Sequence, residues 1–239
     1  MTATYVTSGI TTQGDGGGDG KSFTTGTWTS SDWAIVAVGS SSNADTISAP
    51  GSGTWAEITL TDNVITSSGG QLRAFKGKGL ASSTTYSFTL SGGRRTLVYI
   101  VIASADTTDC VDVAASLETA PGATHAPPSV TPAADSELCI DFAMMRVFSP
   151  EQSTANWTPP VTGLTWTERQ DGHGGDGNNN VRLAGATATA GSSGVGVSTA
   201  TWATTDTFED SLIARILIKS VSGATVTGTA AAALGALAA

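Results

Sequence analysis

The sequence predicts an all-β fold: an antiparallel β-sandwich built from two pseudo-repeats of about five strands each. Three observations lead to this prediction. Four sequence landmarks occur twice in the same order, short apolar segments alternate with turn residues, and no long segment shows the 3.6-residue apolar period of a helix. The composition agrees, because Thr, Val and Ile favour strands and only 13% of the 239 residues are charged.

The duplicated landmarks are an apolar segment, a Pro- and Gly-containing turn that leads into Thr-Trp-x-Glu, a segment with one arginine, and an aliphatic segment. They lie at residues 33–38, 50–57, 72–75 and 96–104 in the first copy and at 138–142, 160–168, 181–184 and 211–220 in the second. Five strands that are apolar on both faces cannot cover themselves, so we expect one sandwich that both copies complete. Two independent sandwiches joined by a linker are the alternative.

The elements follow in order along a domain predicted at 23–221. Residues 1–22 are predicted to be a Gly-rich N-terminal arm, because the run of glycines and aspartates there disfavours a regular element. Strands are predicted at 34–38, 55–60, 71–76, 85–90 and 97–103 in the first copy (about 30–104) and at 137–145, 165–170, 180–186, 195–202 and 212–221 in the second (about 137–221). The segment 105–117 can add one more strand.

Two segments are expected to lie outside the strands of the sandwich. The crossover 118–132 contains four prolines, which exclude a helix or a central strand, so it should run over the surface or along an edge. Residues 222–239 are rich in Ala, Gly and Thr and are predicted to be a linker or tail. They contain too few strongly apolar residues for a membrane span.

Charge and cysteine content restrict the partners. With 20 acidic and 11 basic side chains the net charge is −9, which disfavours nucleic-acid binding. The first residues lack the basic and apolar regions of a signal peptide. Cys110 and Cys139 could form one bridge, but free buried thiols are expected in a protein made in the cytoplasm.

No catalytic constellation and no cofactor are predicted. Glu57 and Glu168 follow the repeated tryptophans and suggest the carboxylate pair of a glycosidase, which needs both groups in one cleft. Residues related by the duplication should instead occupy separate positions, so we expect these glutamates to face solvent. His125 and His173 have no nucleophile motif near them in sequence.

Two further residue sets are weak candidates for binding. Asp171 and Asp176, in a loop rich in Gly and Asn, offer oxygen ligands for a hard cation, although a loop without metal is the preferred interpretation. Exposed tryptophans can stack on sugars, and Trp28, Trp157 and Trp202 are the candidates for glycan contact. The repeated Trp55 and Trp166 are expected to fill the core.

The duplicated pattern resembles β-sandwich virion proteins of tailed phages with Gram-positive, notably actinobacterial, hosts, and related bacterial secreted proteins that are mostly uncharacterised. The resemblance rests on the repeated Thr-Trp-x-Glu segments, on Arg73 with Arg182, and on the closing aliphatic strands, and it spans about residues 30–221. Asp141 and Arg215 depart from the pattern by placing charges in apolar strands, so an edge or interface is expected there.

The resemblance implies a jelly-roll-like sandwich and a virion protein, either tail-associated (a minor tail protein) or a capsid decoration protein. The lack of a signal peptide agrees with assembly in the host cytoplasm. Such a protein would contact other virion proteins and form a symmetric homo-oligomer. The net charge and the composition predict binding to neither nucleic acid nor membrane. The alternative is a carbohydrate-binding, host-adhesion module, and a glycosidase is a third option.

Overall fold

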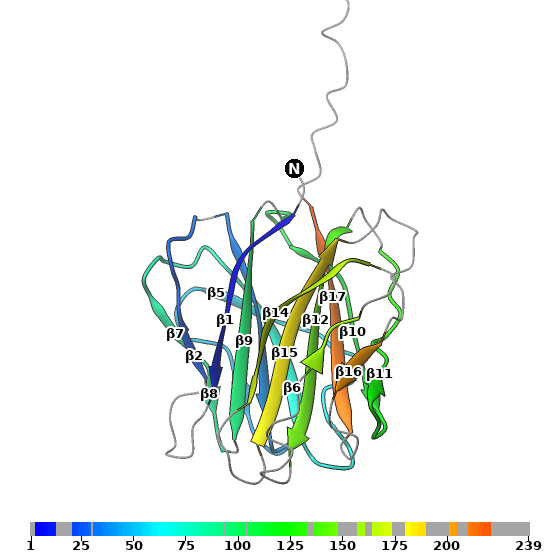
Figure 1. Cartoon of the computed structure of the whole chain (residues 1–239). Coiled ribbons are helices and arrows are strands. Elements are labelled where there is room, and N and C mark those ends of the chain that lie inside the picture. Colours follow the sequence, from blue (N-terminus) through cyan, green and yellow to red (C-terminus); the bar gives the residue numbers. More distant parts are fainter. Residues whose placement is uncertain are drawn as a thin grey trace, which may run out of the picture.

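The computed structural model describes residues 3–12, 21–29, 31–92, 94–103, 105–132, 136–147, 157–160, 164–173, 180–189, 201–204 and 210–220. The regular elements in this part of the chain are all β-strands, and two five-stranded antiparallel sheets lie face to face (Figure 1). The first sheet has the order β1 (Thr4–Thr12), β9 (Arg95–Ala103), β3 (Trp33–Ser40), β6 (Gln71–Lys78) and β5 (Thr54–Ile58). The second has the order β10 (Val111–Thr119), β17 (Ser211–Lys219), β12 (Ser136–Val147), β15 (Asn180–Thr189) and β14 (Trp166–His173).

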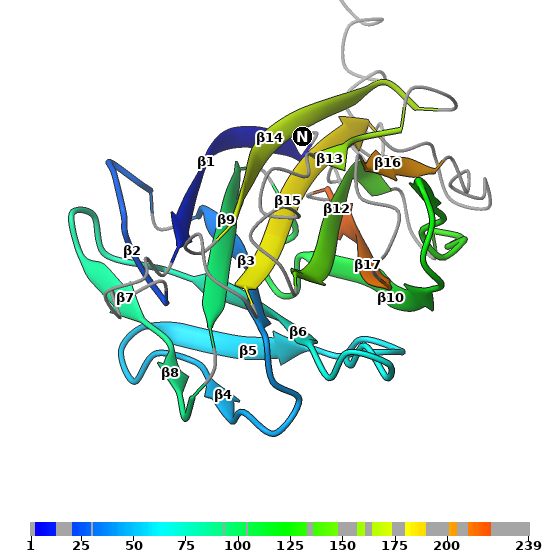
Figure 2. The ribbon, with the colours of Figure 1, turned by 60° about the horizontal axis from the view of Figure 1, so that its bottom comes forward.

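Short strands cover the outer face of each large sheet, and Figure 2 shows the two covers on opposite sides of the molecule. The first cover contains β2 (Ser22–Thr24), β7 (Thr85–Ser87), β4 (Ile47–Ser48) and β8 (Thr89–Leu90). The second contains β11 (Thr124–His125), β16 (Trp202–Thr204) and β13 (Trp157–Thr158). If β7 and β8 count as one interrupted strand, both copies alternate between large sheet and cover in the same jelly-roll-like order.

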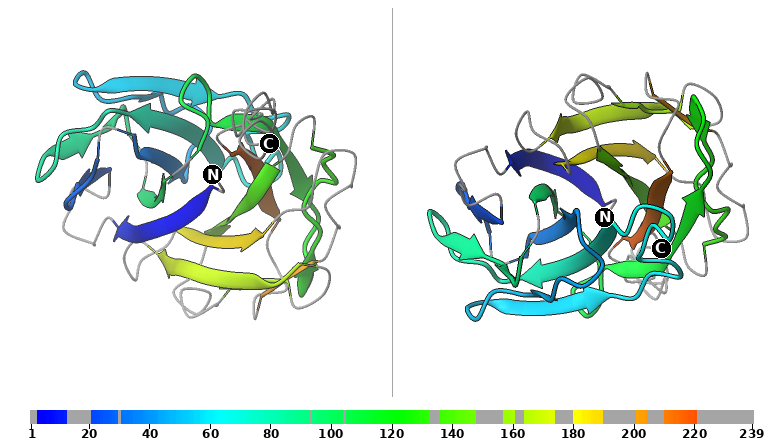
Figure 3. Two further views of the ribbon diagram at one scale, coloured as in Figure 1. Left: turned by 90° about the horizontal axis from the view of Figure 1, so that it is seen from above. Right: turned by 90° about the horizontal axis from the view of Figure 1, so that it is seen from below.

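The shared interior lies between the two large sheets, which Figure 3 shows end-on. Ile35 and Ile100 of the first sheet meet Phe142, Leu183 and Ile216 of the second in one apolar cluster, and all five are fully buried. Because side chains alternate between the faces of a strand, the intervening residues pack under the covers instead. Each fully buried side chain of this size contributes about 1.5–3 kcal/mol. The single sandwich completed by both copies is therefore the observed arrangement.

The predicted N-terminal arm is wrong for part of its length. Thr4–Thr12 form β1, which pairs with β9 along its whole length. Its Thr-rich sequence has only a few apolar residues, but the edge of the first sheet satisfies its backbone hydrogen bonds. The two copies accordingly begin at β1 and at β10, earlier than the predicted starts near 30 and 137.

The predicted strands that fall on described residues are confirmed, with ends that shift by a few residues. The segment 105–117 does contribute most of β10, and the crossover 118–132 runs over the outer face of the second sheet, where Thr124–His125 form β11. Residues 13–20, 195–200 and 222–239, which include parts of the predicted arm, strand and tail, lie outside the described residues.

Asp141 and Arg215 do not mark an edge, because β12 and β17 are interior strands of the second sheet. They lie opposite each other and form a fully buried, two-pronged ion pair, with the Arg215 Nε and Nη2 atoms each 2.8 Å from an Asp141 oxygen. Trp202 Nε1 donates a third hydrogen bond to Asp141 at 3.1 Å. The corresponding cross-strand pair in the first sheet is Val36 with Tyr99, so the second copy has replaced an apolar contact by a charged one.

This ion pair predicts strongly coupled substitutions. Arg215→Met should destabilise the fold by about 3–5 kcal/mol, because it leaves the Asp141 carboxylate buried without a counter-charge. Adding Asp141→Val removes the orphaned charge, so the double variant should be more stable than Arg215→Met alone. Urea unfolding followed by tryptophan fluorescence measures the stability of the two single variants and of the double variant. A double variant whose loss of stability equals the sum of the two single losses would contradict this coupling.

Candidate functional site

The two glutamates that suggested a glycosidase do not share a cleft. Glu57 lies on β5 and Glu168 on β14, and these strands end opposite edges of the sandwich (Figure 3). The Glu57 carboxylate accepts a hydrogen bond from Arg73 Nη1 at 2.8 Å. The pKa of Glu168 is raised, first by burial and then by the charge of Asp171. A two-carboxylate mechanism needs the groups about 5–10 Å apart, so the expectation of separate, solvent-facing glutamates holds.

His125 belongs to a buried hydrogen-bonded network that the sequence did not indicate. Its Nδ1 atom lies 2.8 Å from both Thr119 Oγ1 and Ser211 Oγ, and the two hydroxyls are 2.6 Å apart. A serine beside a histidine is the arrangement of a nucleophile and its base. Here, however, His125 and Ser211 are both completely buried, and the His125 ring packs edge-on against Trp157. The network therefore holds the second cover onto β10 and β17. The side chain of His173 lies outside the described residues.

Asp171 is engaged by an arginine and is not open to a cation. Arg182 donates two hydrogen bonds to its carboxylate, from Nε at 3.0 Å and from Nη2 at 2.9 Å, and the backbone N–H of Trp157 donates a third at 3.1 Å. Both partners of the ion pair are largely buried, with 5% and 10% of their side chains exposed. Asp176, the second candidate ligand, lies outside the described residues.

The three tryptophans proposed for glycan contact are buried, so the expectation that they are exposed is wrong. Trp28, Trp157 and Trp202 are 8%, 2% and 0% exposed, and they fill the space between a large sheet and its cover. The repeated Trp55 and Trp166 are instead half-buried on the edge strands β5 and β14. The Trp55 ring lies against Gly77, where a Cβ atom would come within 2.6 Å of it. The exposure of a tryptophan in this protein thus depends on its position in the fold. Its repetition in the sequence does not predict it.

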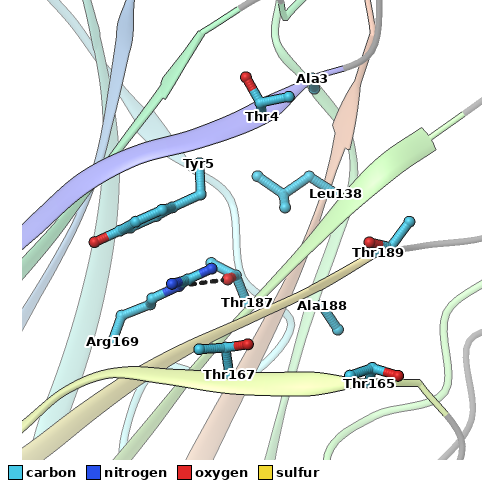
Figure 4. A pocket seen from close by; sticks show the side chains of 10 residues that line it. All are labelled: Ala3, Thr4, Tyr5, Leu138, Thr165, Thr167, Arg169, Thr187, Ala188 and Thr189. Carbon is cyan, nitrogen blue, oxygen red and sulfur yellow. Dashed lines mark hydrogen bonds between the residues drawn. The ribbon is translucent and has the colours of Figure 1, made fainter.

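A pocket opens where edge strand β1 of the first sheet faces β14 and β15 of the second, as Figure 4 shows. We call it the β1–β14 pocket, and its volume is about 240 Å³. Its walls are mostly small and polar. They are formed by Ala3, Thr4, Tyr5, Leu138, Thr165, Thr167, Arg169, Thr187, Ala188 and Thr189.

Arg169 is the one cationic side chain among the residues that line this pocket. Its guanidinium lies 3.6 Å from the centre of the Tyr5 ring, and its Nε atom donates a hydrogen bond of 2.7 Å to Thr187 Oγ1 (Figure 4). Within the described part of the chain, no carboxylate forms an ion pair with Arg169. The stacking and the hydrogen bond fix the plane of the guanidinium and leave its terminal nitrogens for another acceptor.

A β-bulge places Arg169 in the pocket. Glu168 and Gln170 lie opposite the neighbouring residues Ala186 and Gly185, so Arg169 is an extra residue in β14. A bulge turns a side chain away from the regular alternation of a strand. Sequence reasoning missed this residue because nothing in the repeat marks an insertion of one position, although an arginine without a counterpart in the first copy was a visible signal.

Cys110 and Cys139 are both buried and free, as expected. Burial raises the pKa of Cys110 to about 12 and that of Cys139 well above its ordinary value. At pH 8 only about one Cys110 thiol in ten thousand is a thiolate.

The thiols should therefore be inert in the folded protein. We expect an aromatic disulfide reagent at pH 8 to modify neither cysteine in the native state and both after unfolding in guanidinium, measured by thiolate release. Modification of the native protein at the rate of a free cysteine would contradict the burial of these groups.

A second prediction concerns Asp171. Asp171→Asn should destabilise the fold by about 2–4 kcal/mol, because it removes a buried carboxylate that accepts two hydrogen bonds from Arg182 and one from the Trp157 N–H. The loss should be the same in excess calcium and in a chelator, measured by chemical unfolding. Glu57→Gln, which breaks an exposed pair, is the control and should cost less than about 1 kcal/mol. A calcium-dependent stability that Asp171→Asn abolishes would show that the aspartate is a ligand after all.

Among the described residues, no group of three or more His, Cys, Asp or Glu side chains could hold a metal ion. No helix within them is long and apolar enough to cross a membrane. Comparisons of the chain with protein-family models, with curated proteins and with solved structures give no match.

Proposed function

We propose that this chain is a non-enzymatic virion structural protein, tail-associated or decorating a capsid, that acts through protein–protein contacts. The virion setting comes from the resemblance of the duplicated motifs to phage β-sandwich proteins. The mode of action comes from the edges of the two large sheets.

The observation that carries this proposal is the position of the exposed apolar side chains. Among the described residues, two large hydrophobic side chains are exposed: Val6 at 44% and Leu117 at 40%. They lie on β1 and β10, which are edge strands and correspond to each other in the duplication. An edge strand presents unpaired backbone groups along its outer side, and an added strand from a partner satisfies them.

The rest of the sandwich suits a rigid scaffold. Both faces of each large sheet are covered, so the sheets hold their edges in fixed positions. The net charge of −9 favours solubility before assembly and disfavours contact with nucleic acid. Sites on virus particles are related by symmetry, so a homo-oligomer such as a trimer or a ring is the expected form.

The carbohydrate-binding alternative loses the feature on which it was based. Trp28, Trp157 and Trp202 pack inside the fold and cannot offer a stacking surface for a sugar. Glu57 and Glu168 are likewise too far separated in the fold for a shared glycosidase site.

The proposal predicts an association that depends on the edge of β10. We expect the purified chain to form a symmetric oligomer and Leu117→Lys to shift it toward monomer, because a charge on an exposed edge opposes strand pairing. Light scattering coupled to size-exclusion chromatography measures both states. Thr89→Lys adds the same charge at an exposed residue of the first cover and should leave the oligomer intact.

The virion setting is tested separately. Mass spectrometry of virus particles purified from the source of the chain should detect it in a fixed ratio to the major capsid or tail protein. A chain that is monomeric at all concentrations and absent from such particles would overturn the proposal.

A further inference from the structure

The two copies can be compared residue by residue at the β1–β14 pocket, because their sheets pair in the same register. Trp33 lies opposite Lys78 in the first sheet, and Leu138 lies opposite Thr189 in the second. Trp33 and Leu138 also each lie opposite an isoleucine of the neighbouring strand, β9 or β17. Leu138 therefore corresponds to Trp33, and Thr189 corresponds to Lys78.

The same register relates two further residues of the pocket to their counterparts. Two positions earlier along β15 and β6, Thr187 corresponds to Lys76. Tyr5 of β1 and Val111 of β10 lie opposite those same two isoleucines. Counting back two residues from each, Ala3 corresponds to Asp109.

At the equivalent place, where the chain before β10 of the second sheet meets β6 of the first, the chain's own side chains fill the space. Lys76 Nζ forms an ion pair with the Asp109 carboxylate at 2.5 Å. Lys78 Nζ lies 5.3 Å from the centre of the Trp33 ring and also donates a hydrogen bond to the carbonyl of Thr107. The pKa of Asp109 is lowered, since the hydrogen bonds from Lys76 and from the Val111 N–H outweigh the effect of burial. A cation and a carboxylate of the same chain thus neutralise each other here.

At the β1–β14 pocket a smaller residue stands at each of these four positions. Leu138 takes the place of a tryptophan, Thr187 and Thr189 take the places of lysines, and Ala3 takes the place of the aspartate. These exchanges leave the open volume of the β1–β14 pocket. The bulge residue Arg169 restores a cation to it, but the carboxylate has no replacement among the described residues.

We propose that the β1–β14 pocket binds a carboxylate group supplied from outside the chain, with Arg169 as its cationic partner. The guanidinium is held flat by Tyr5 and by Thr187, so its two terminal nitrogens can donate a parallel pair of hydrogen bonds to the two oxygens of a carboxylate. The surrounding threonine hydroxyls can donate to the remaining lone pairs. This inference does not depend on the proposed virion function.

The carboxylate can come from a free small acid or from an acidic side chain of a partner protein, and one experiment distinguishes the two sources. Sodium acetate, a peptide-capped aspartate (N-acetyl-aspartyl-N-methylamide) and inorganic phosphate are titrated into the full chain at constant ionic strength. Amide chemical shifts of Tyr5, Thr167 and Thr187 report binding. We expect saturable shifts with both carboxylates and a dissociation constant on the order of 1 mM.

The relative affinities then identify the source. Tighter binding of the capped aspartate than of acetate would indicate an acidic side chain of a partner, and equal binding would indicate recognition of the carboxylate alone, as a free acid provides it. Tighter binding of phosphate than of either carboxylate would overturn the assignment to a carboxylate.

Variants test the role of each residue. Arg169→Gln should weaken carboxylate binding by at least about tenfold. Ala3→Asp introduces the carboxylate that Asp109 supplies at the equivalent place, and it should also reduce binding because the new side chain occupies the site itself. Arg73→Gln removes a half-buried arginine of β6 that pairs with Glu57 of the edge strand β5, and it should leave binding unchanged. Thermal melting checks that each variant is folded. The absence of saturable shifts in the original chain, or equal binding by the chain and by folded Arg169→Gln, would overturn the proposal.

Discussion

Burial of both faces of each large sheet is the constraint on which this fold depends. A five-stranded sheet with apolar side chains on both sides needs a partner on each face. The inner faces of the two sheets cover each other, and each copy folds short strands back over its own outer face. The duplication therefore covers the two inner faces, because each copy supplies one of the two sheets. The two outer faces are covered separately, each by the short strands of its own copy.

The separate covers explain how the copies could diverge while the shared interior stayed apolar. Under the first cover, Tyr99 stacks on Phe23 with ring centres 4.5 Å apart. Under the second, its counterpart Arg215 pairs with Asp141 and lies 5.1 Å from the centre of the Trp166 ring. A charged pair is tolerated there because Asp141 accepts two hydrogen bonds from Arg215 and one from Trp202. The charged pair that distinguishes the second copy thus lies on the outer face of its sheet.

Much of the architecture could be predicted from the sequence, because the long central strands are continuous apolar runs bounded by turn residues. Strand β1 could not, since its Thr-rich sequence resembles a loop and its pairing depends on an edge that only the folded sheet provides. Tryptophan burial was also misjudged, because the covers that enclose Trp157 and Trp202 are only two or three residues long and leave no periodic pattern. The pocket was beyond sequence reasoning for a similar reason. It results from a single bulged residue, Arg169, and from size differences at corresponding positions that become visible only when the sheets fix the register.

The two ends of the described fold meet at one point, and this has a mechanical consequence. The backbone N–H of Ala3 donates a hydrogen bond of 3.0 Å to Ser220 Oγ, and Ser220 also pairs with Ala105. Ala3 and Ser220, the first and last described residues of the fold, therefore lie side by side. Tension applied through both of them would act on this one junction and would not stretch the sandwich from end to end. The interior between the two large sheets would therefore bear none of this load.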